Sequence, residues 1–540
     1  MANKWIDSDY LNRNLKLFKE KILEKLYMHK SNPTGTGYIA MNVPAGSAIG
    51  DNSLTVGTLS LANGTGSVAE GYNTYATGLY SHAQNNSTVA NADYSHVEGN
   101  SCQTNKTASE SHAEGYATQT YGEDSHSEGH TTKAYNKASH SEGIRSQAGD
   151  SDGYTNSDNM SSQHAEGYET IATGNASHAE GVKGYAGGEA SHVEGYNSGY
   201  LQGMLCGAHG IASHCEGYHN VALGNYSHVE GSSNYANGQY SHIEGYNNTA
   251  TNFYSHCEGS SNKVYGLSAH SEGDFNTSSG SYSHTEGQYT FAMGEASHAE
   301  GCGINGTYSN MATNSGAHAE GYCTKATGIG AHAEGCGETD YDYNTYQYVV
   351  KYMNTAGGEA SHCEGYGCGA TGKGSHAEGV KTSAMGEGSH SGGYYTVART
   401  NYSTAVGMFN EYKNVNNLFM VGNGVDDKNR TNAFEVDKQG NARIQNELLV
   451  TDGSKYIDYT DVEFEFEIEQ DEKINTSLDF ELPTNRWLSS ITIIPSVENY
   501  VMSNVYRDEQ GAYFLCSKNT DETITYKGVV RFTLIKKGSE

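Results

Sequence analysis

The chain has 540 residues, with 67 Gly, 42 Tyr and only 4 Pro, and its formal net charge is −31. Such an acidic chain is excluded as a nucleic-acid binder that works by neutralising phosphates, because that activity requires a basic surface. Apolar residues make up only 35% of the chain, which argues against a large conventional hydrophobic core. Scarce proline and abundant tyrosine argue equally against disorder, so we expect a repeat architecture.

The segment 1–32 predicts a helix that serves attachment and trimerisation. Asp7 and Ser8 can cap a helix that runs to about His29. Its apolar residues are spaced close to a coiled-coil seam; they are Leu11, Leu15, Phe18, Ile22 and Leu26. The alternative is a single amphipathic helix packed on the first repeat. Neither a secretory signal nor a membrane-spanning segment is visible in the sequence, so we expect no membrane insertion.

Residues 33–407 are dominated by one repeat. The pentapeptide x-His-x-Glu-Gly occurs eighteen times, and most copies begin fourteen positions after the one before. Where the interval is longer, the excess reads as an insertion, and these insertions precede His112, His164, His214, His318 and His362. A second half-motif, Ala-x-Gly, precedes many of the histidines. Two short alternating segments, each closed by Gly, predict two strands and two turns, which is one coil of a parallel β-solenoid.

The sizes of the side chains predict the faces of each coil. Small residues (Ser, Ala, Gly and the residue between His and Glu) should point inward, while His and Glu point outward together. Three of the ten cysteines occupy the small inward position between His and Glu, and we expect them to be buried residues rather than disulfide partners; they are Cys215, Cys257 and Cys363. On the other strand we expect Tyr, Asn, Thr and Lys to face solvent.

At the ends of the array, apolar residues replace His or Glu. Leu54, Val56, Val68 and Val406 lie at these equivalent positions. We therefore infer that the His/Glu face is an interface, for which three-fold symmetry is the natural closed arrangement. From position 54 to position 404 the period gives 23 coils, or a shaft on the order of 110 Å long.

Beyond the repeat, residues 408–454 form a connector, and residues 455–540 have a different composition and lack the period of the repeat. Alternation between Val462 and Ile468 and four further strand-like runs predict a small antiparallel β-sandwich; the runs are 487–494, 513–516, 523–526 and 529–535. We expect it to be the tip that contacts a host, or alternatively a cap that locks the trimer.

The repeat resembles the head of YadA-like trimeric autotransporter adhesins, in which Ser-x-Ala-x-Gly recurs with the same period. The resemblance covers about residues 45–407 and implies a left-handed parallel β-roll packed as a homotrimer. The SHAEG variant and the segment from Leu418 to Val436 are similar to those of phage and phage-like tail fibres. This second resemblance implies a virion tail or an extracellular tail-like particle, made in the host cytoplasm. It also implies a tail or baseplate protein as the partner of the N-terminal helix.

Three kinds of chemistry fit rows of His and carboxylate. Imidazoles gathered about a three-fold axis can bind Zn, Ni or Fe, and paired carboxylates can hydrolyse glycans. Because the motif occurs in eighteen equivalent copies, however, it marks no single metal or catalytic site. It favours a structural role, in which His donors satisfy Glu carboxylates across chains and between coils. We therefore expect no catalytic residue, metal or cofactor. The predicted trimer-interface ladder consists of His178, Glu180, His192, Glu194, His228, Glu230, His242, Glu244, His256, Glu258, His284, Glu286, His298 and Glu300.

This packing predicts that the Glu row raises the pKa of the histidines above about 6.5. A raised His pKa stabilises the fold at low pH, and the contribution is lost as pH rises through the folded value. The expected result is a shaft that withstands mild acid better than alkali.

Candidate receptor contacts are aromatic, because tyrosine offers flat amphipathic area to sugars and insertions in solenoids become loops on one face. They lie in the insertion before His362 and in the C-terminal segment: Tyr341, Tyr343, Tyr346, Tyr348, Tyr352 and Trp487. The alternative for the tyrosines is stacking from coil to coil, and for Trp487 a place in the core. Together the sequence predicts a homotrimeric tail fibre that binds a bacterial surface receptor, a glycan by preference, without turnover. The alternatives are a bacterial surface adhesin and a glycan-cleaving tailspike.

Overall fold

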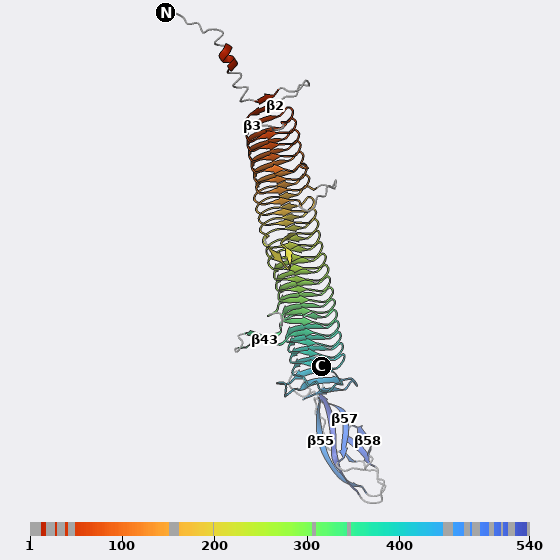
Figure 1. The fold of residues 1–540 in the computed structure, drawn as a ribbon. Coiled ribbons are helices and arrows are strands. Elements are labelled where there is room, and N and C mark those ends of the chain that lie inside the picture. The colour runs from red at the N-terminus through yellow and green to blue at the C-terminus, as the bar shows by residue number, and fades with distance from the viewer. Residues whose placement is uncertain are drawn as a thin grey trace, which may run out of the picture. The chain divides into compact units, whose positions relative to one another are not determined.

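The computed structural model describes residues 12–17, 27–29, 38–41, 49–150, 161–197, 199–304, 309–342 and 347–445, and six strands between 457 and 536. The chain divides into two compact units, Met1–Ser389 (unit 1) and His390–Glu540 (unit 2). Figure 1 shows the ribbon, and the predicted all-β parallel solenoid is confirmed.

One sheet of unit 1 carries the His-x-Glu-Gly segments, which pair in parallel with His beside His and, in the longer strands, Glu beside Glu. Its strands are β3 (Leu54–Thr58), β5 (Val68–Tyr72), β7 (His82–Asn86), β9 (His96–Asn100), β11 (His112–Tyr116), β13 (His126–His130), β15 (His140–Ser141), β17 (His164–Ala165), β19 (His178–Ala179), β21 (His192–Val193), β25 (His214–Cys215), β27 (His228–Val229), β29 (His242–Ile243), β31 (His256–Ser260), β33 (His270–Asp274), β35 (His284–Gln288), β37 (His298–Cys302), β39 (His318–Tyr322), β41 (His332–Ala333), β45 (His362–Tyr366) and β47 (His376–Val380).

The second sheet carries the half-motif, also in parallel register, with Ala beside Ala in most coils. Its strands are β4 (Leu61–Ala62), β6 (Tyr75–Ala76), β8 (Val89–Ala90), β10 (Gln103–Thr104), β12 (Gln119–Thr120), β14 (Lys133–Ala134), β16 (Gln147–Ala148), β18 (Ile171–Ala172), β20 (Tyr185–Ala186), β24 (Gly207–Ala208), β26 (Val221–Ala222), β28 (Tyr235–Ala236), β30 (Thr249–Ala250), β32 (Lys263–Val264), β34 (Thr277–Ser278), β36 (Thr290–Ala292), β38 (Asn310–Ala312), β40 (Thr324–Ala326), β44 (Asn354–Ala356), β46 (Gly369–Ala370) and β48 (Ser383–Ala384).

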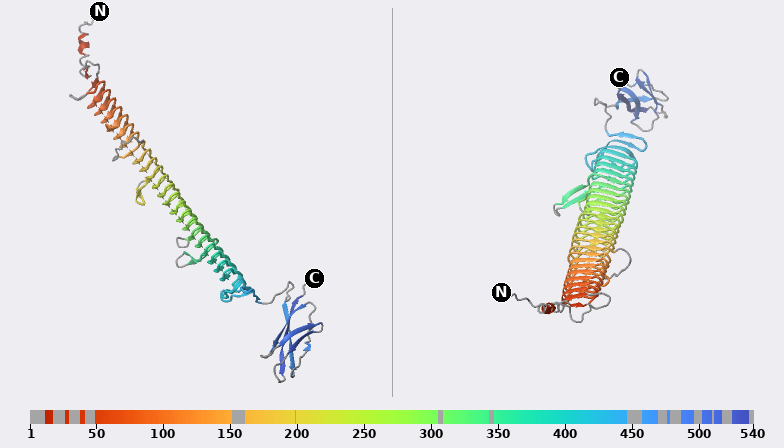
Figure 2. Two further views of the ribbon diagram at one scale, coloured as in Figure 1. Left: turned by 90° about the vertical axis from the view of Figure 1, so that its right-hand side faces the viewer. Right: turned by 90° about the horizontal axis from the view of Figure 1, so that it is seen from above.

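The inserted residues project from the solenoid and do not interrupt the pairing of its strands. His192 pairs with His214, and His332 pairs with His362, across the insertions that precede His214 and His362. The extra residues form hairpins, β22 (Tyr200–Leu201) with β23 (Met204–Leu205), and β42 (Glu338–Asp342) with β43 (Gln347–Tyr352). The views in Figure 2 show the second hairpin projecting sideways from the coils.

The interior between the two sheets is narrow and lined by small residues. Alanines such as Ala222, Ala236 and Ala250 are fully buried, and the three predicted inward cysteines are fully buried as well. Buried serines close the turn into the His strand, as where Ser227 Oγ donates to the Gly224 carbonyl oxygen at 2.7 Å. One expectation was wrong: the Asn and Thr residues that precede the second strand, such as Thr74 and Asn234, point inward and are fully buried.

Glycine is required where the His strand ends. Gly231 has a φ of +98°, and a Cβ there would collide with the Gly245 carbonyl oxygen of the next coil. The turn before each buried Ser instead uses an ordinary left-handed conformation, which Ala176 and Ala190 adopt with a φ of 53°.

At the N-terminus the structure corrects the predicted helix. Residues 12–17 are helical, but Tyr27–His29 form strand β1, antiparallel to β2 (Tyr38–Met41), so the helix does not reach His29. The β2 strand pairs in parallel with β3 and adds one strand to the first sheet. The remainder of the predicted coiled-coil segment lies outside the described residues.

Unit 2 begins with β49 (His390–Tyr394), β50 (Val397–Ala398) and β51 (Thr404–Met408), followed by β52 (Asn417–Asn423), β53 (Asn432–Asp437) and β54 (Ala442–Ile444). The β51–β52 pair is parallel, whereas the β52–β53 and β53–β54 pairs are antiparallel. The parallel strand pairing of the repeat therefore ends at β52. The C-terminal strands form two antiparallel three-stranded sheets, β55 (Ile457–Ile468), β60 (Ile524–Lys536) and β57 (Arg486–Pro495) in one, and β56 (Thr476–Ser477), β59 (Gly511–Cys516) and β58 (Met502–Asp508) in the other.

Candidate functional site: a ladder of histidine and glutamate

The His side chains of unit 1 form a continuous stack on the outer side of the first sheet. From His82 to His376 neighbouring rings lie 4.6 to 5.0 Å apart between centroids and are tilted by no more than 10°. The stack follows from the sequence, because parallel register places each His above the last, one strand spacing away. All the predicted ladder residues lie in these two rows, the His row and the Glu row beside it.

Contacts between the two rows run within one coil and between coils. His112 Nε2 lies 3.6 Å from Glu114 Oε2 in the same coil, whereas His82 Nε2 lies 3.3 Å from Glu70 Oε1 of the preceding coil. Several ring nitrogens, including those of His178 and His228, are covered but make no hydrogen bond within the described chain. The side chains themselves are about one-third exposed, at 34% for His112 and 32% for Glu114. His82–Glu70 thus shows the predicted hydrogen bond between coils, whereas for ring nitrogens such as those of His178 and His228 the predicted bonds across chains stay a prediction.

Burial within the stack lowers the pKa of several histidines. Burial, together with repulsion from the neighbouring rings of His256 and His284, lowers the pKa of His270 to about 4. Burial first, and in most cases like-charged neighbours, also lower the pKa of His96, His112, His126, His140, His164, His178, His214 and His298. For these nine histidines the expectation that the Glu row raises the His pKa was wrong, because burial of the ring outweighs the attraction of the carboxylates.

This direction reverses the expected response to pH. A lowered His pKa contributes stability that is lost as pH falls from the unfolded value near 6.5 toward the folded value. We expect the melting temperature of the full chain to fall between pH 7.5 and pH 5, measured by circular dichroism at constant ionic strength. His270→Asn should make this fall shallower, whereas Lys263→Asn on the second sheet should leave it unchanged. A pH dependence of the melting temperature that is the same in His270→Asn and in the unchanged chain would contradict the assignment.

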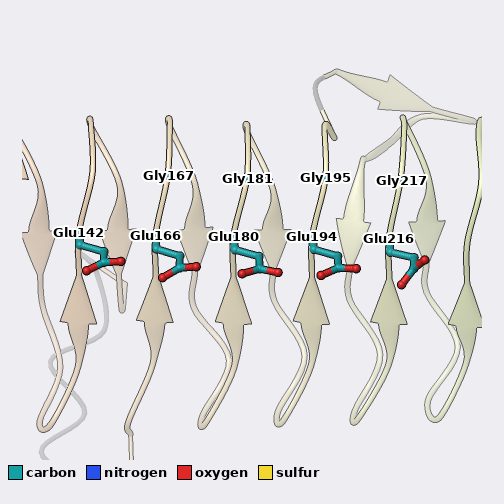
Figure 3. Close-up of a pocket in the computed structure, with 9 residues that line it drawn as sticks. All are labelled: Glu142, Glu166, Gly167, Glu180, Gly181, Glu194, Gly195, Glu216 and Gly217. Carbon is teal, nitrogen blue, oxygen red and sulfur yellow. The ribbon is translucent and has the colours of Figure 1, made fainter.

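The Glu row lines an open groove. Figure 3 shows Glu142, Glu166, Glu180, Glu194 and Glu216 side by side, one per coil, along a hollow of about 670 Å³. Between Glu98 and Glu166, hydrogen bonds with the carboxyls on either side, chiefly Glu128, raise the pKa of Glu114 to about 7 and likewise that of Glu142. The intervening Glu98, Glu128 and Glu166 have lowered pKa values, because they accept those hydrogen bonds. In this stretch, a protonated carboxyl alternates with an ionised one, which relieves the repulsion between them.

Groups of two His and one Glu, such as His126, Glu128 and His140, have ligand atoms within 4.8 Å of one another and could in principle hold a metal ion. The rings of His126 and His140 are parallel within 1° and 4.8 Å apart. Because the lone pair of an imidazole nitrogen lies in the plane of its own ring, two stacked rings do not converge on one ion. The geometry of one chain therefore suits stacking better than chelation.

The candidate receptor residues are only partly within the described chain. Tyr341 packs edge-on against Tyr348 in the β42–β43 hairpin, with ring centroids 5.2 Å apart. Tyr348 and Tyr352 are 53% and 61% exposed, respectively. A Lys381–Glu338 ion pair of 2.8 Å, itself mostly covered, ties the base of the hairpin to the coils. Trp487 lies in β57, and Tyr343 and Tyr346 lie outside the described residues.

The sequence reasoning missed a second, buried ladder made of asparagine. The Asn234 Nδ2 donates to the Glu230 carbonyl oxygen at 2.6 Å and to that of Gly245 at 2.8 Å, and Asn234 Oδ1 accepts from the Asn248 backbone N–H at 2.8 Å. The pattern repeats through Asn220, Asn234, Asn248, Asn262 and Asn276. Its signal in the sequence is Asn at every fourteenth position along this stretch.

Comparison with known proteins adds no assignment. No protein-family model matches the chain, and no curated protein matches it. Within the described residues no helix has the length and apolar character needed to cross a membrane.

Proposed function

We propose that the chain is the shaft-forming subunit of a homotrimeric fibre that attaches a phage, or a phage tail-like particle, to a bacterial surface. The observation that carries the proposal is the pair of partly exposed rows, imidazole beside carboxylate, along one side of unit 1. The SHAEG repeats and their resemblance to tail fibres support the class of particle.

The two rows are complementary to a second copy of themselves. Imidazole N–H groups donate and carboxylates accept, so the Glu row of one chain can face the His row of the next around a three-fold axis. The His ring centroids are spaced evenly, 4.6 to 5.0 Å apart. The His row of one chain can therefore stay in register with the Glu row of the next chain along its whole length. Alternate protonation between Glu98 and Glu166 lowers the repulsion between three such rows.

The proposal predicts that the full chain has the mass of three chains by light scattering. Replacing His214, His228 and His242 together by Asp places like charges opposite the partner's Glu row and should reduce the mass to that of one chain. The matched control, Tyr235→Asp, Thr249→Asp and Lys263→Asp, changes neighbouring coils on the second sheet and should leave the mass unchanged. Circular dichroism verifies that both variants keep their β-structure. A wild-type protein with the mass of one chain would refute the trimer.

Attachment is tested separately by sedimenting the labelled protein with whole bacteria of candidate hosts. Binding without release of oligosaccharide supports the fibre, whereas release of reducing sugar favours the glycan-cleaving tailspike. A protein that binds none of the hosts of the particle that carries it would refute the proposed function.

A further inference from the structure

One edge of the solenoid carries a column of exposed tyrosines. The residue before each buried Ser sits at the turn from the second sheet to the first. Tyr226, Tyr240 and Tyr254 occupy this place in three successive coils. Their rings stack with centroids 5.0 Å apart and tilts of 8° and 5°.

The column then lacks one ring. The next coil has Ser268 at this position, and the coil after that has Tyr282. The backbone is nearly the same in all three coils, with φ of 57° at Tyr254, 51° at Ser268 and 59° at Tyr282. The side chains therefore leave the turn in the same direction, and Tyr254 and Tyr282 lie two coils, or about 10 Å, apart.

Among Tyr226, Tyr240, Tyr254 and Tyr282, the two on either side of Ser268 are the more exposed. Tyr254 and Tyr282 are each 58% exposed, compared with 47% for Tyr240, which has a ring in the coils on both sides. Ser268 thus has a small side chain where the coils on either side carry a phenol ring, and we call the position between Tyr254 and Tyr282 the notch. Its flank is apolar, because Phe253 is 48% exposed and Leu267 is half-buried beside it.

We propose that this notch, formed by Tyr254, Ser268 and Tyr282, binds one pyranose ring of a neutral saccharide. A flat ligand ring takes the place of the absent tyrosine and presents its C–H faces to the two phenol rings. The serine and tyrosine hydroxyls meet the hydroxyl rim of the sugar. The residues that precede the column positions are all uncharged, which favours a neutral ligand over an ionic one; they are Asn225, Gln239, Phe253, Leu267 and Ser281.

The choice of a saccharide as the ligand rests on the proposed function, because the surface of a bacterium offers glycans. The absence of one tyrosine ring from the column does not depend on the proposed function. A small aromatic compound is the competing occupant, because it too can stack between two phenol rings.

The test uses saturation-transfer NMR on the full chain with neutral methyl glycosides of glucose, galactose and N-acetylglucosamine, and with benzyl alcohol as the aromatic probe. We expect at least one glycoside to bind through its ring protons. Ser268→Tyr fills the notch with the protein's own ring and should abolish this binding while the fold is kept. Tyr254→Ala or Tyr282→Ala removes one wall and should weaken binding roughly threefold to tenfold. Tyr226→Ala removes a tyrosine of the same column outside the notch and should leave binding unchanged.

Glycoside binding that survives Ser268→Tyr, no binding of any glycoside, or binding of benzyl alcohol alone would each overturn the proposal. The proposed fibre function is tested separately, by attachment of the same variants to host cells. Full attachment of the Ser268→Tyr protein to host cells would show that attachment does not use the notch. Notch-dependent glycoside binding by a protein that attaches to no cells would refute the fibre and leave the notch in place.

Discussion

Gly231→Ala should destabilise the solenoid by roughly 2–6 kcal/mol, the sum of a strained backbone and a steric collision. The φ of Gly231 is +98°, and the added methyl group would meet the Gly245 carbonyl oxygen of the neighbouring coil. Because that oxygen belongs to the backbone of a hydrogen-bonded stack, neither partner can move without breaking register. Faster amide exchange in the coils around residues 217–245, and a lower urea midpoint, are the expected measurements.

The matched control is Gly374→Ala. This glycine has a φ of +60° and nothing within 4 Å of the position of its Cβ. Ala176 and Ala190 occupy the equivalent place in their own coils. The change should therefore cost only the strain of a left-handed alanine, about 1–2 kcal/mol. Equal losses in the two variants would show that the collision with the next coil is not the reason for glycine.

Asn234→Ala should cost roughly 3–6 kcal/mol, because it leaves three buried backbone groups without their partner. The groups are the Glu230 and Gly245 carbonyls and the Asn248 N–H. The most direct measurement is amide exchange of Asn248, which loses its side-chain acceptor and should exchange much faster.

Asn247→Ala provides the comparison, since Asn247 precedes Asn248 in the chain but is exposed and donates only a long, 3.3 Å hydrogen bond to Ser261 Oγ. We expect it to change stability by less than about 0.5 kcal/mol. Asn234→Thr should fall between the two variants, because Thr132 at the equivalent position donates to the Glu128 carbonyl at 3.0 Å. An Asn234→Ala protein as stable as Asn247→Ala would show that water replaces the asparagine.

The sequence was sufficient to predict the period, the parallel register and the shared face of His and Glu, because one strict repeat fixes all three. His192 aligns with His214 and His332 with His362 as the count of inserted residues requires. Simple alternation from the inward Ala236, two residues later, already places Asn234 on the inner face. The sequence alone does not show the buried carbonyl partners that satisfy its amide, so its polar character argues for exposure.

The charge state of the ladder was also beyond the sequence. The repeat shows that His270 is near Glu272, which by itself would raise a His pKa, but not that two other imidazoles cover the ring. At the C-terminus, the composition predicts separate strands at 523–526 and 529–535, with Gly528 between them. Gly528 instead pairs with Phe464 and Pro495 inside the single strand β60, because long-range pairing overrides the local preference of glycine.

The coil-to-coil register also determines how such a chain can change in length. Since every rung is paired with an equivalent rung, a deletion or duplication of one whole period rejoins identical surfaces and leaves the neighbours undisturbed. An insertion or deletion of seven residues, half a period, would instead pair a strand that carries the Ala-x-Gly motif with a strand that carries the His-x-Glu-Gly motif. Adding or removing whole repeats would therefore change the length of the solenoid in steps of about 4.8 Å.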